Sequence, residues 1–247
     1  KLRHDTSVCS EAGARPNFMK IAPLMAAMKK SSLIEPLLVH TGQHYDEKMS
    51  KLFFEDLEIP KPDIELEVGS GSHAVQTARI MERFEATLIK EIPHLILVVG
   101  DVNSTIACAL TAAKLTIPVA HVEAGLRSFD RTMPEEINRI LTDAISDYLF
   151  TTERGAHQNL LREGIPDDHI YFVGNVMIDT LLKHREKSET SDVLNRLMLV
   201  DQTASGDKRV ATPYAVLTLH RPANVDNDAI LHSIISAMML ISKDIRI

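Results

Sequence analysis

The sequence predicts an α/β fold with a doubly wound parallel sheet, because short apolar runs alternate with longer segments of helical period. The run at 95–99 is apolar at every position, which is typical of a strand buried on both faces. The expected strands are residues 34–40, 95–99, 117–122, 148–151, 171–173 and 214–219. The expected helices are residues 17–30, 72–91, 104–115, 134–146, 155–163 and 227–242.

This pattern weakens at two places, the first strand and the boundary between domains. A strand should precede Gly13, yet residues 5–12 are too polar for the centre of such a sheet. Residues 183–208 are polar and charged, so we expect an N-terminal Rossmann-like domain over 1–180 and the start of a second one over 181–247. The second part contains one expected strand and one expected helix, and a complete doubly wound domain needs more.

Composition indicates a soluble globular protein and argues against binding to nucleic acid or to a membrane. Of the 247 residues, 45% are hydrophobic and 25% are charged, with a net charge of −7, so we expect no broad basic surface. No signal peptide is visible and no apolar stretch is long enough to span a bilayer, so we expect a cytoplasmic protein. Cys9 and Cys108 have neither metal-binding nor redox spacing, and we expect two reduced thiols.

Polar residues follow the expected strands at the positions where open parallel sheets bind their ligands. Asp101 and Glu123 each end an apolar run, where a carboxylate would lose its water unless it faced a cleft. Arg15 and Lys20 flank the start of the helix expected at 17–30. A basic helix start is a candidate phosphate site, although basic residues in a first turn are more commonly just solvated.

Further charged residues open a later helix and follow the last expected strand. Glu135 and Glu136 open an expected helix, where the helix dipole stabilises acidic side chains, so these residues need no other role. His220 and Arg221 follow the last expected strand, so they would face the acidic residues if two domains met across a cleft. The other histidines lack the paired spacing of a metal site.

Six strings carry a resemblance to a known enzyme family. They are Gly-Ala-Arg-Pro-Asn-Phe-Met-Lys at 13–20, Thr-Gly-Gln-His-Tyr-Asp at 41–46, Gly-Asp at 100–101, His-Val-Glu-Ala-Gly-Leu-Arg-Ser at 121–128, Pro-Glu-Glu-Ile-Asn-Arg at 134–139 and Leu-His-Arg-Pro-Ala-Asn-Val at 219–225. In this order and at this spacing, they resemble the non-hydrolysing UDP-N-acetylglucosamine (UDP-GlcNAc) 2-epimerases from about residue 13 onward. The resemblance implies a GT-B-like fold, in which two Rossmann-like domains hold a nucleotide sugar in the cleft between them.

The reaction implied by this resemblance inverts C2 of UDP-GlcNAc and gives UDP-N-acetylmannosamine (UDP-ManNAc). The C2 hydrogen is not next to a carbonyl group, so a base alone cannot form a stabilised anion there. No G-x-G-x-x-G string opens an expected helix, so a nicotinamide cofactor is not indicated. The family is thought to eliminate UDP while a carboxylate takes the C2 proton, and then to add UDP back to 2-acetamidoglucal. The resemblance implies neither a metal nor any other cofactor.

The resemblance also assigns candidate residues to this chemistry. Carboxylates would move the C2 proton, cations would bind or stabilise the departing UDP, and a further pair belongs to a regulatory UDP-GlcNAc site of bacterial members. The carboxylates are Asp101, Glu123 and Glu135, the cations are Arg15, Lys20, Arg221 and the catalytic His220, and the regulatory pair is Gln43 and His44.

Two alternatives remain open at this point. A hydrolysing epimerase would perform the same elimination but add water, releasing free N-acetylmannosamine and UDP, although the string at 13–20 favours the non-hydrolysing branch. A non-catalytic remnant would bind a nucleotide sugar or a partner without turnover, since the family's uridine-binding segment is expected beyond residue 247. The expected partners are UDP-GlcNAc, UDP-ManNAc and a second copy of the chain in a homodimer.

Overall fold

The computed structural model describes residues 6–13, 15–42, 54–200, 213–219 and 222–247. The chain divides into two compact units, Lys1–His184 and Arg185–Ile247. Each unit is described by itself below.

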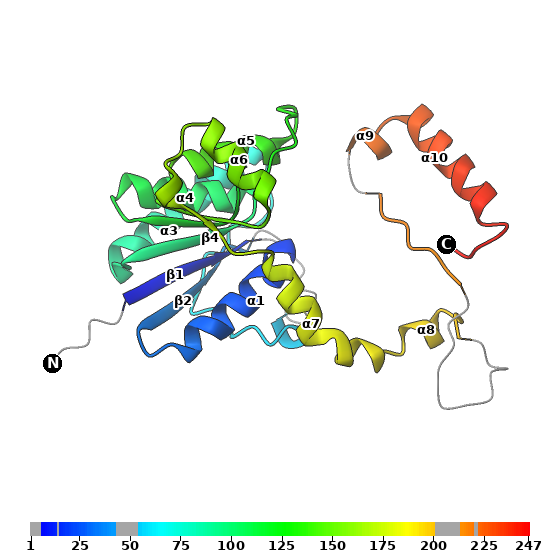
Figure 1. Ribbon diagram of the computed structural model, residues 1–247, viewed down its shortest axis with the longest axis horizontal. Helices are drawn as coiled ribbons and strands as arrows, with labels where there is room; N and C mark the ends of the chain where they lie inside the picture. The colour runs from blue at the N-terminus through cyan, green and yellow to red at the C-terminus, as the bar shows by residue number, and fades with distance from the viewer. Residues whose placement is uncertain (1–5, 14, 43–53, 201–212, 220–221) are drawn as a thin grey trace. The chain divides into compact units, whose positions relative to one another are not determined.

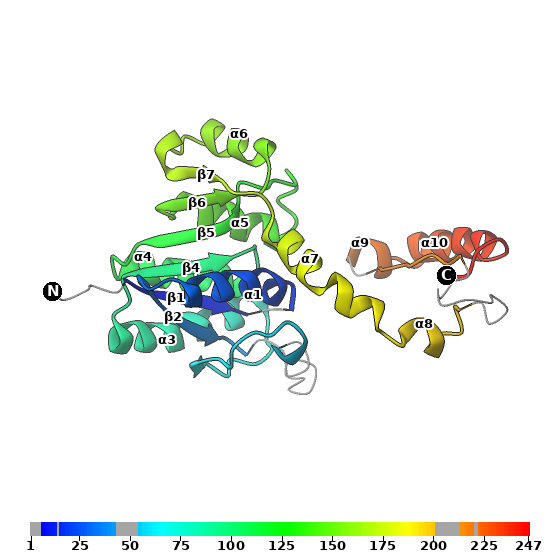
Figure 2. The same ribbon diagram turned by 60° about the horizontal axis from the view of Figure 1, so that its bottom comes forward.

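The first unit contains a sheet in which, over the described residues, seven parallel strands are hydrogen-bonded in the order β3-β2-β1-β4-β5-β6-β7 (Figure 2). The strands are β1 (Thr6–Ala12), β2 (Ile34–His40), β3 (Ile64–Glu65), β4 (Leu95–Val99), β5 (Val119–Ala124), β6 (Tyr148–Thr151) and β7 (Ile170–Phe172). The predicted α/β class with a parallel sheet is therefore confirmed. The chain order of the strands reverses between β1 and β4, and ligands of such sheets bind beyond the carboxyl ends of the strands at this point.

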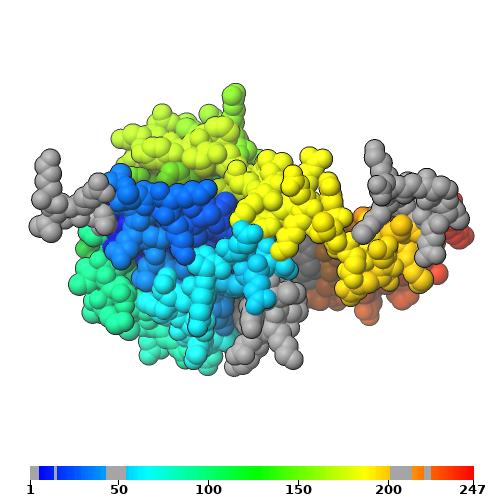
Figure 3. Space-filling view, turned by 90° about the horizontal axis from the view of Figure 1, so that it is seen from below, coloured from blue at the N-terminus to red at the C-terminus, as the bar shows by residue number. Residues whose placement is uncertain are grey.

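Helices cover both faces of the sheet (Figure 1). They are α1 (Arg15–Lys30), α3 (His73–Glu91), α4 (Asn103–Lys114), α5 (Pro134–Ala144), α6 (Arg154–Arg162) and α7 (Val176–Glu189), with a 3-10 turn η1 (Asp167–His169) before β7. The core on one face contains Phe18 and Ile21 of α1, and the other contains Phe84 of α3 and Ala109 of α4. The Thr180 hydroxyl of α7 donates to a carbonyl oxygen of α1 at 2.6 Å, and the two helices lie side by side in Figure 3.

The segment before Gly13 forms β1, a central strand, although its polarity argued against that position. All seven residues of β1 pair with β2, and Val8, Cys9 and Ser10 also pair with β4. Ser10 and Glu11 are fully buried. The strand expected before Gly13 is therefore present in spite of its polarity, because pairing with strands on both sides outweighs the low intrinsic suitability of these residues for a buried strand.

The two cysteines are buried and unbridged in the core formed with α3 and α4. Burial raises the pKa of the Cys9 thiol to about 12, and the nearby carboxyl group of Glu11 acts in the same direction. Burial likewise raises the pKa of Cys108 well above its usual range. Both thiols are therefore protonated in the folded protein.

The second unit contains the short helices α8 (Val193–Arg196) and α9 (Pro222–Val225) and the longer α10 (Asp228–Ile241). Asn227 caps α10, because its side-chain oxygen accepts from the backbone nitrogens of Ala229 and Ile230 at 3.1 Å. The prediction of a strand at 214–219 is wrong, since only Tyr214 in this range forms a β-bridge, and its partner is Arg246. Its apolar sequence suits a strand, but the described part of this unit offers no neighbouring strand with which to pair.

Within the described parts of the chain, no helix combines the length and the apolar character that crossing a membrane requires.

Candidate active site

Asp101 and Glu123 lie at the carboxyl ends of two adjacent parallel strands. Asp101 follows β4 after a single residue, Gly100, and Glu123 lies one residue before the end of β5. The backbone nitrogen of Gly100 donates to the carbonyl oxygen of Val122 at 3.0 Å, which ties the two strand ends together. The register of β5 against β6 shifts at Glu123, where φ is +75°. Such an irregularity re-aims a side chain relative to a regular strand.

Each of these two carboxylates forms an ion pair with a basic residue from a helix. Glu123 pairs with the buried Lys20 of α1, and Asp101 pairs with Arg139 of α5. Asn138 donates from its side-chain nitrogen to the backbone oxygen of Asp101 at 2.9 Å. Because both carboxylates remain partly accessible, they are available to a ligand at this edge of the sheet.

Gly100 allows α1 to approach these strand ends closely. Its φ is +70°, and a Cβ atom at this position would lie 2.8 Å from Lys20 Nζ, 3.0 Å from Asn17 Oδ1 and 3.4 Å from Glu123 Oε2. A side chain at residue 100 would therefore push against the Lys20–Glu123 pair. The turn after β4 brings residues from two strands and one helix together.

Glu135 and its neighbour Glu136 have different surroundings in the first turn of α5. Glu135 is half-buried, and no hydrogen bond or ion pair joins its side chain to any residue that the structure describes. The buried Glu136 instead accepts from the backbone nitrogens of Ser128 and Phe129 at 3.0 and 2.9 Å. Burial opposes its ionisation, but these hydrogen bonds and the charge of Arg139 outweigh burial and lower the pKa of Glu136. Glu136 thus fixes the loop that precedes α5.

The other predicted site residues lie where the structure gives no side-chain description. Arg15 begins α1, but its side chain lies outside the described residues. Gln43, His44, His220 and Arg221 lie outside them entirely. Of the predicted set, the structure therefore brings together Asp101, Glu123 and Lys20 at one edge of the sheet.

Sequence reasoning missed two residues that contact Asp101, namely Asn138 and Arg139. Both belong to the string at 134–139, so a signal was present in the sequence. Their role was not visible because it depends on how α5 packs against the turn after β4. Helical spacing places residues three and four positions after Glu135 on one side of α5, where these two meet Asp101.

Glu11 is a further buried carboxyl group at the same edge of the sheet. Burial raises the pKa of Glu11 to about 7, against an opposing effect of the Ser104 hydroxyl. Polar side-chain atoms that lack a hydrogen bond of good geometry to the described residues occur on Ser10, Glu11, Asn17, Thr41 and Ser104. Since buried polar groups are normally hydrogen-bonded, these atoms remain able to form hydrogen bonds with a further group.

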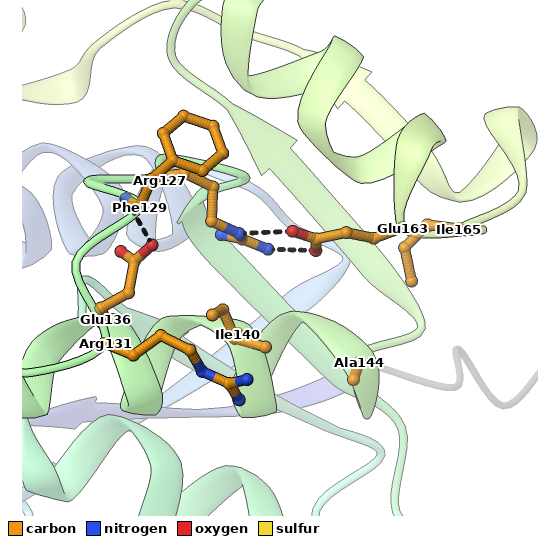
Figure 4. A pocket seen from close by; sticks show the side chains of 8 residues that line it. All are labelled: Arg127, Phe129, Arg131, Glu136, Ile140, Ala144, Glu163 and Ile165. Atoms are coloured by element: carbon orange, nitrogen blue, oxygen red, sulfur yellow. Dashed lines mark hydrogen bonds and ion pairs between the residues drawn. The ribbon is translucent and has the colours of Figure 1, made fainter.

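A pocket of about 400 Å³ lies beside α5 (Figure 4). It is lined by Arg127, Phe129, Arg131, Glu136, Ile140, Ala144, Glu163 and Ile165. Within it, the Arg127 guanidinium donates two hydrogen bonds to the Glu163 carboxylate, at 2.8 and 2.6 Å. None of the predicted site residues lines this pocket. In the described part of the chain, no group of three or more His, Cys, Asp or Glu side chains is arranged to hold a metal ion.

Comparison with known proteins gives concordant matches. The sequence profile of a family described as UDP-N-acetylglucosamine 2-epimerase matches residues 26–247. The UDP-N-acetylglucosamine 2-epimerase of Methanocaldococcus jannaschii is 45% identical over 229 residues, which cover 92% of this chain and 60% of that protein. The UDP-2,3-diacetamido-2,3-dideoxy-D-glucuronate 2-epimerase of Pseudomonas aeruginosa is 44% identical over 228 residues, with the same two coverages. The chain thus spans about 60% of the length of these relatives.

A solved structure extends the match to three dimensions. The crystal structure of the M. jannaschii UDP-GlcNAc 2-epimerase in complex with UDP-GlcNAc and UDP has a TM-score of 0.85 and 43% identity. The match covers 96% of this chain and 63% of that chain. The fold class expected from the sequence, an α/β fold of GT-B-like type, is confirmed.

Proposed function

The chain belongs to the UDP-N-acetylglucosamine 2-epimerase family, and we propose that the protein interconverts UDP-GlcNAc and UDP-ManNAc without hydrolysing them. The observation that carries the proposal is the pair of accessible carboxylates, Asp101 and Glu123, on adjacent strand ends. Each carboxylate has its own basic partner, Arg139 or Lys20. This arrangement supports the proposal, because the reaction needs proton-transfer groups and cations close together.

The proposed reaction is an elimination followed by an addition. One carboxylate takes the C2 proton while the bond between C1 and the β-phosphate oxygen breaks, and its electron pair leaves with UDP. The electrons of the C2–H bond form the C1–C2 double bond of 2-acetamidoglucal. UDP then adds back to C1, while a protonated carboxyl group delivers a proton to the opposite face of C2. The reaction therefore requires one basic and one protonated carboxyl group around the sugar.

A cation accompanies each carboxylate, Lys20 beside Glu123 and Arg139 beside Asp101. A pyrophosphate group that binds at this edge of the sheet would compete with Glu123 for Lys20. We propose that Glu135 completes the acidic cluster and that Arg15, Lys20, His220 and Arg221 bind UDP.

Solvent hydrogen exchange tests the elimination step. A carboxylate that accepts the C2 proton need not return the same one, so product formed in deuterium oxide should carry deuterium at C2. Mass spectrometry and proton NMR of the purified UDP-sugar measure this label. Unlabelled product would exclude the proposed elimination. Label in UDP-ManNAc, with no free N-acetylmannosamine, separates the non-hydrolysing reaction from the hydrolysing one.

A second substrate is favoured by one of the relatives. The P. aeruginosa protein named for UDP-2,3-diacetamido-2,3-dideoxy-D-glucuronate is as similar to this chain as the M. jannaschii protein named for UDP-GlcNAc. Both names describe inversion at C2, so the same carboxylates would serve either sugar. Measuring kcat/KM for both UDP-sugars with one enzyme preparation decides between them, and a higher value for the diacetamido sugar would replace UDP-GlcNAc as the proposed substrate.

A further inference from the structure

His121 of β5 is fully buried and has an oxygen acceptor at each ring nitrogen. Its Nε2 lies 2.8 Å from the carbonyl oxygen of Gly100, and its Nδ1 lies 2.7 Å from Oδ1 of Asp143 on α5. A carbonyl oxygen can only accept a hydrogen bond, so Nε2 must carry a proton. Whether Nδ1 also carries one depends on the state of Asp143.

The contacts of Asp143 indicate that it is an ionised carboxylate. Its Oδ2 accepts from the backbone nitrogen of Gly125 at 3.0 Å and pairs with the Arg127 guanidinium at 2.8 Å. Burial opposes ionisation of Asp143, but the charges and hydrogen bonds of His121 and Arg127 outweigh it and lower its pKa. Arg127 is in turn paired with Glu163, as Figure 4 shows. Since both neighbours of His121 are acceptors, the ring must donate from both nitrogens and carry a positive charge.

The two members of this pair hold the two strand ends that present the carboxylates. His121 bonds the carbonyl group of Gly100, which immediately precedes Asp101. Asp143 bonds the backbone nitrogen of Gly125, two residues after Glu123. One buried pair thus bonds a backbone group at the end of β4 and another at the end of β5.

We propose that His121 and Asp143 are positioning residues, a buried imidazolium–carboxylate pair that sets the separation of Asp101 and Glu123. This role rests on the proposed function, because the separation matters for proton transfer at C2. Neither side chain is required to touch the substrate. The pair acts through the backbone, so its loss should affect the chemical step more than substrate binding.

The first part of the test reads the charge of His121 without substrate. NMR of protein labelled with ¹⁵N-histidine should show a proton on both ring nitrogens of His121 at pH 7. In Asp143→Asn, an amide that can donate replaces the carboxylate oxygen facing Nδ1, so that nitrogen should lose its proton while the other hydrogen bonds are kept. A wild-type His121 with a single ring proton would overturn the charged pair.

The second part compares two substitutions that each preserve half of the contacts. The Gln amide in His121→Gln can replace Nε2 and still bond Gly100, whereas the shorter Asn in His121→Asn cannot. We expect kcat to fall on the order of 10- to 100-fold in His121→Asn, the scale of a misplacement of about 1 Å, with little change in KM. His121→Gln should recover most of this loss. Equal kcat values in the two variants would overturn the positioning role.

A matched control is the pair formed by His157 and Asp167, whose Nε2–Oδ1 distance is also 2.7 Å. The His157 side chain is partly exposed, that of Asp167 is exposed, and neither holds the end of β4 or β5, so His157→Asn should leave kcat unchanged. If the wild-type protein has no epimerase activity, the proposed function fails, and the positioning role is read from backbone amide shifts instead. The Asp101 and Gly125 resonances should then move in His121→Asn and stay near their wild-type positions in His121→Gln. Shifts of equal size would overturn the role.

Discussion

Replacing Glu11 by Gln should change how the stability of the protein depends on pH. The Glu11 carboxyl group is fully buried, and its pKa rises from 4.5 to about 7 on folding. Between these values the unfolded chain has released its proton while the folded protein still holds it. Folding is therefore favoured by protonation of Glu11, and this contribution is complete below pH 4.5 and is lost as pH rises through 7.

The size of the effect follows from the pKa difference. A difference of about 2.5 units corresponds to about 3 kcal/mol of unfolding free energy, at 1.36 kcal/mol per unit. Gln has nearly the shape of a protonated Glu and does not titrate. At pH 5, just above the unfolded pKa, Glu11→Gln should be more stable by only about 0.8 kcal/mol, whereas at pH 8 it should be more stable by about 3 kcal/mol.

Urea unfolding followed by circular dichroism at pH 5, 6, 7 and 8 measures this difference. Subtracting the wild-type value at each pH removes the titration of all other groups. Glu85→Gln is the matched control, because it makes the same substitution at an exposed position of α3. If the advantage of Glu11→Gln changed by less than about 0.5 kcal/mol between pH 5 and pH 8, the range of an ordinary surface substitution, the reasoning would be refuted.

Three further predictions concern the candidate site. Asp101→Asn and Glu123→Gln should each lower turnover by about 100-fold or more with the fold intact, and near-normal UDP-ManNAc formation in a coupled assay would make that carboxylate structural. Gly100→Ala should cost more stability in urea than Gly164→Ala, because both glycines have positive φ but only Gly100 has atoms close to a new Cβ; equal losses would show that the approach of Lys20 is unimportant. UDP should bind the chain of residues 1–247 no more tightly than about millimolar, because Lys20 and Arg139 are already paired with carboxylates. Micromolar binding in calorimetry would contradict this expectation.

Three strands, β2, β4 and β6, were predicted at their observed bounds. The clearest signal came from β4, where burial on both faces gives a run that is apolar at every position. The presence of β1 in spite of its polar sequence and the absence of a strand at 214–219 have one cause. A strand forms when neighbours pair with its backbone, and the residues of the segment alone do not report those neighbours.

The placement of the candidate carboxylates was predictable to the extent that it follows from strand ends. Asp101 and Glu123 were proposed because a carboxylate at the end of a buried strand loses its water unless it faces a cleft. The ion pair of Lys20 with Glu123, and the contacts of Arg139 and His121, join residues far apart in sequence. No local spacing encodes these contacts, so they required the packing of α1 and α5 against the sheet.

The burial of Cys9 and Cys108 has a practical consequence for handling the protein. Burial raises the pKa of Cys9 to about 12, so this thiol stays protonated at pH 7, whereas the thiolate is the form that alkylating agents attack. The folded protein should thus be inert to iodoacetamide and keep in air without a reducing agent. Any alkylation that does occur then requires local opening of the central sheet. The alkylation rate, measured by intact-mass spectrometry, therefore reports how often β1 and α4 open to solvent.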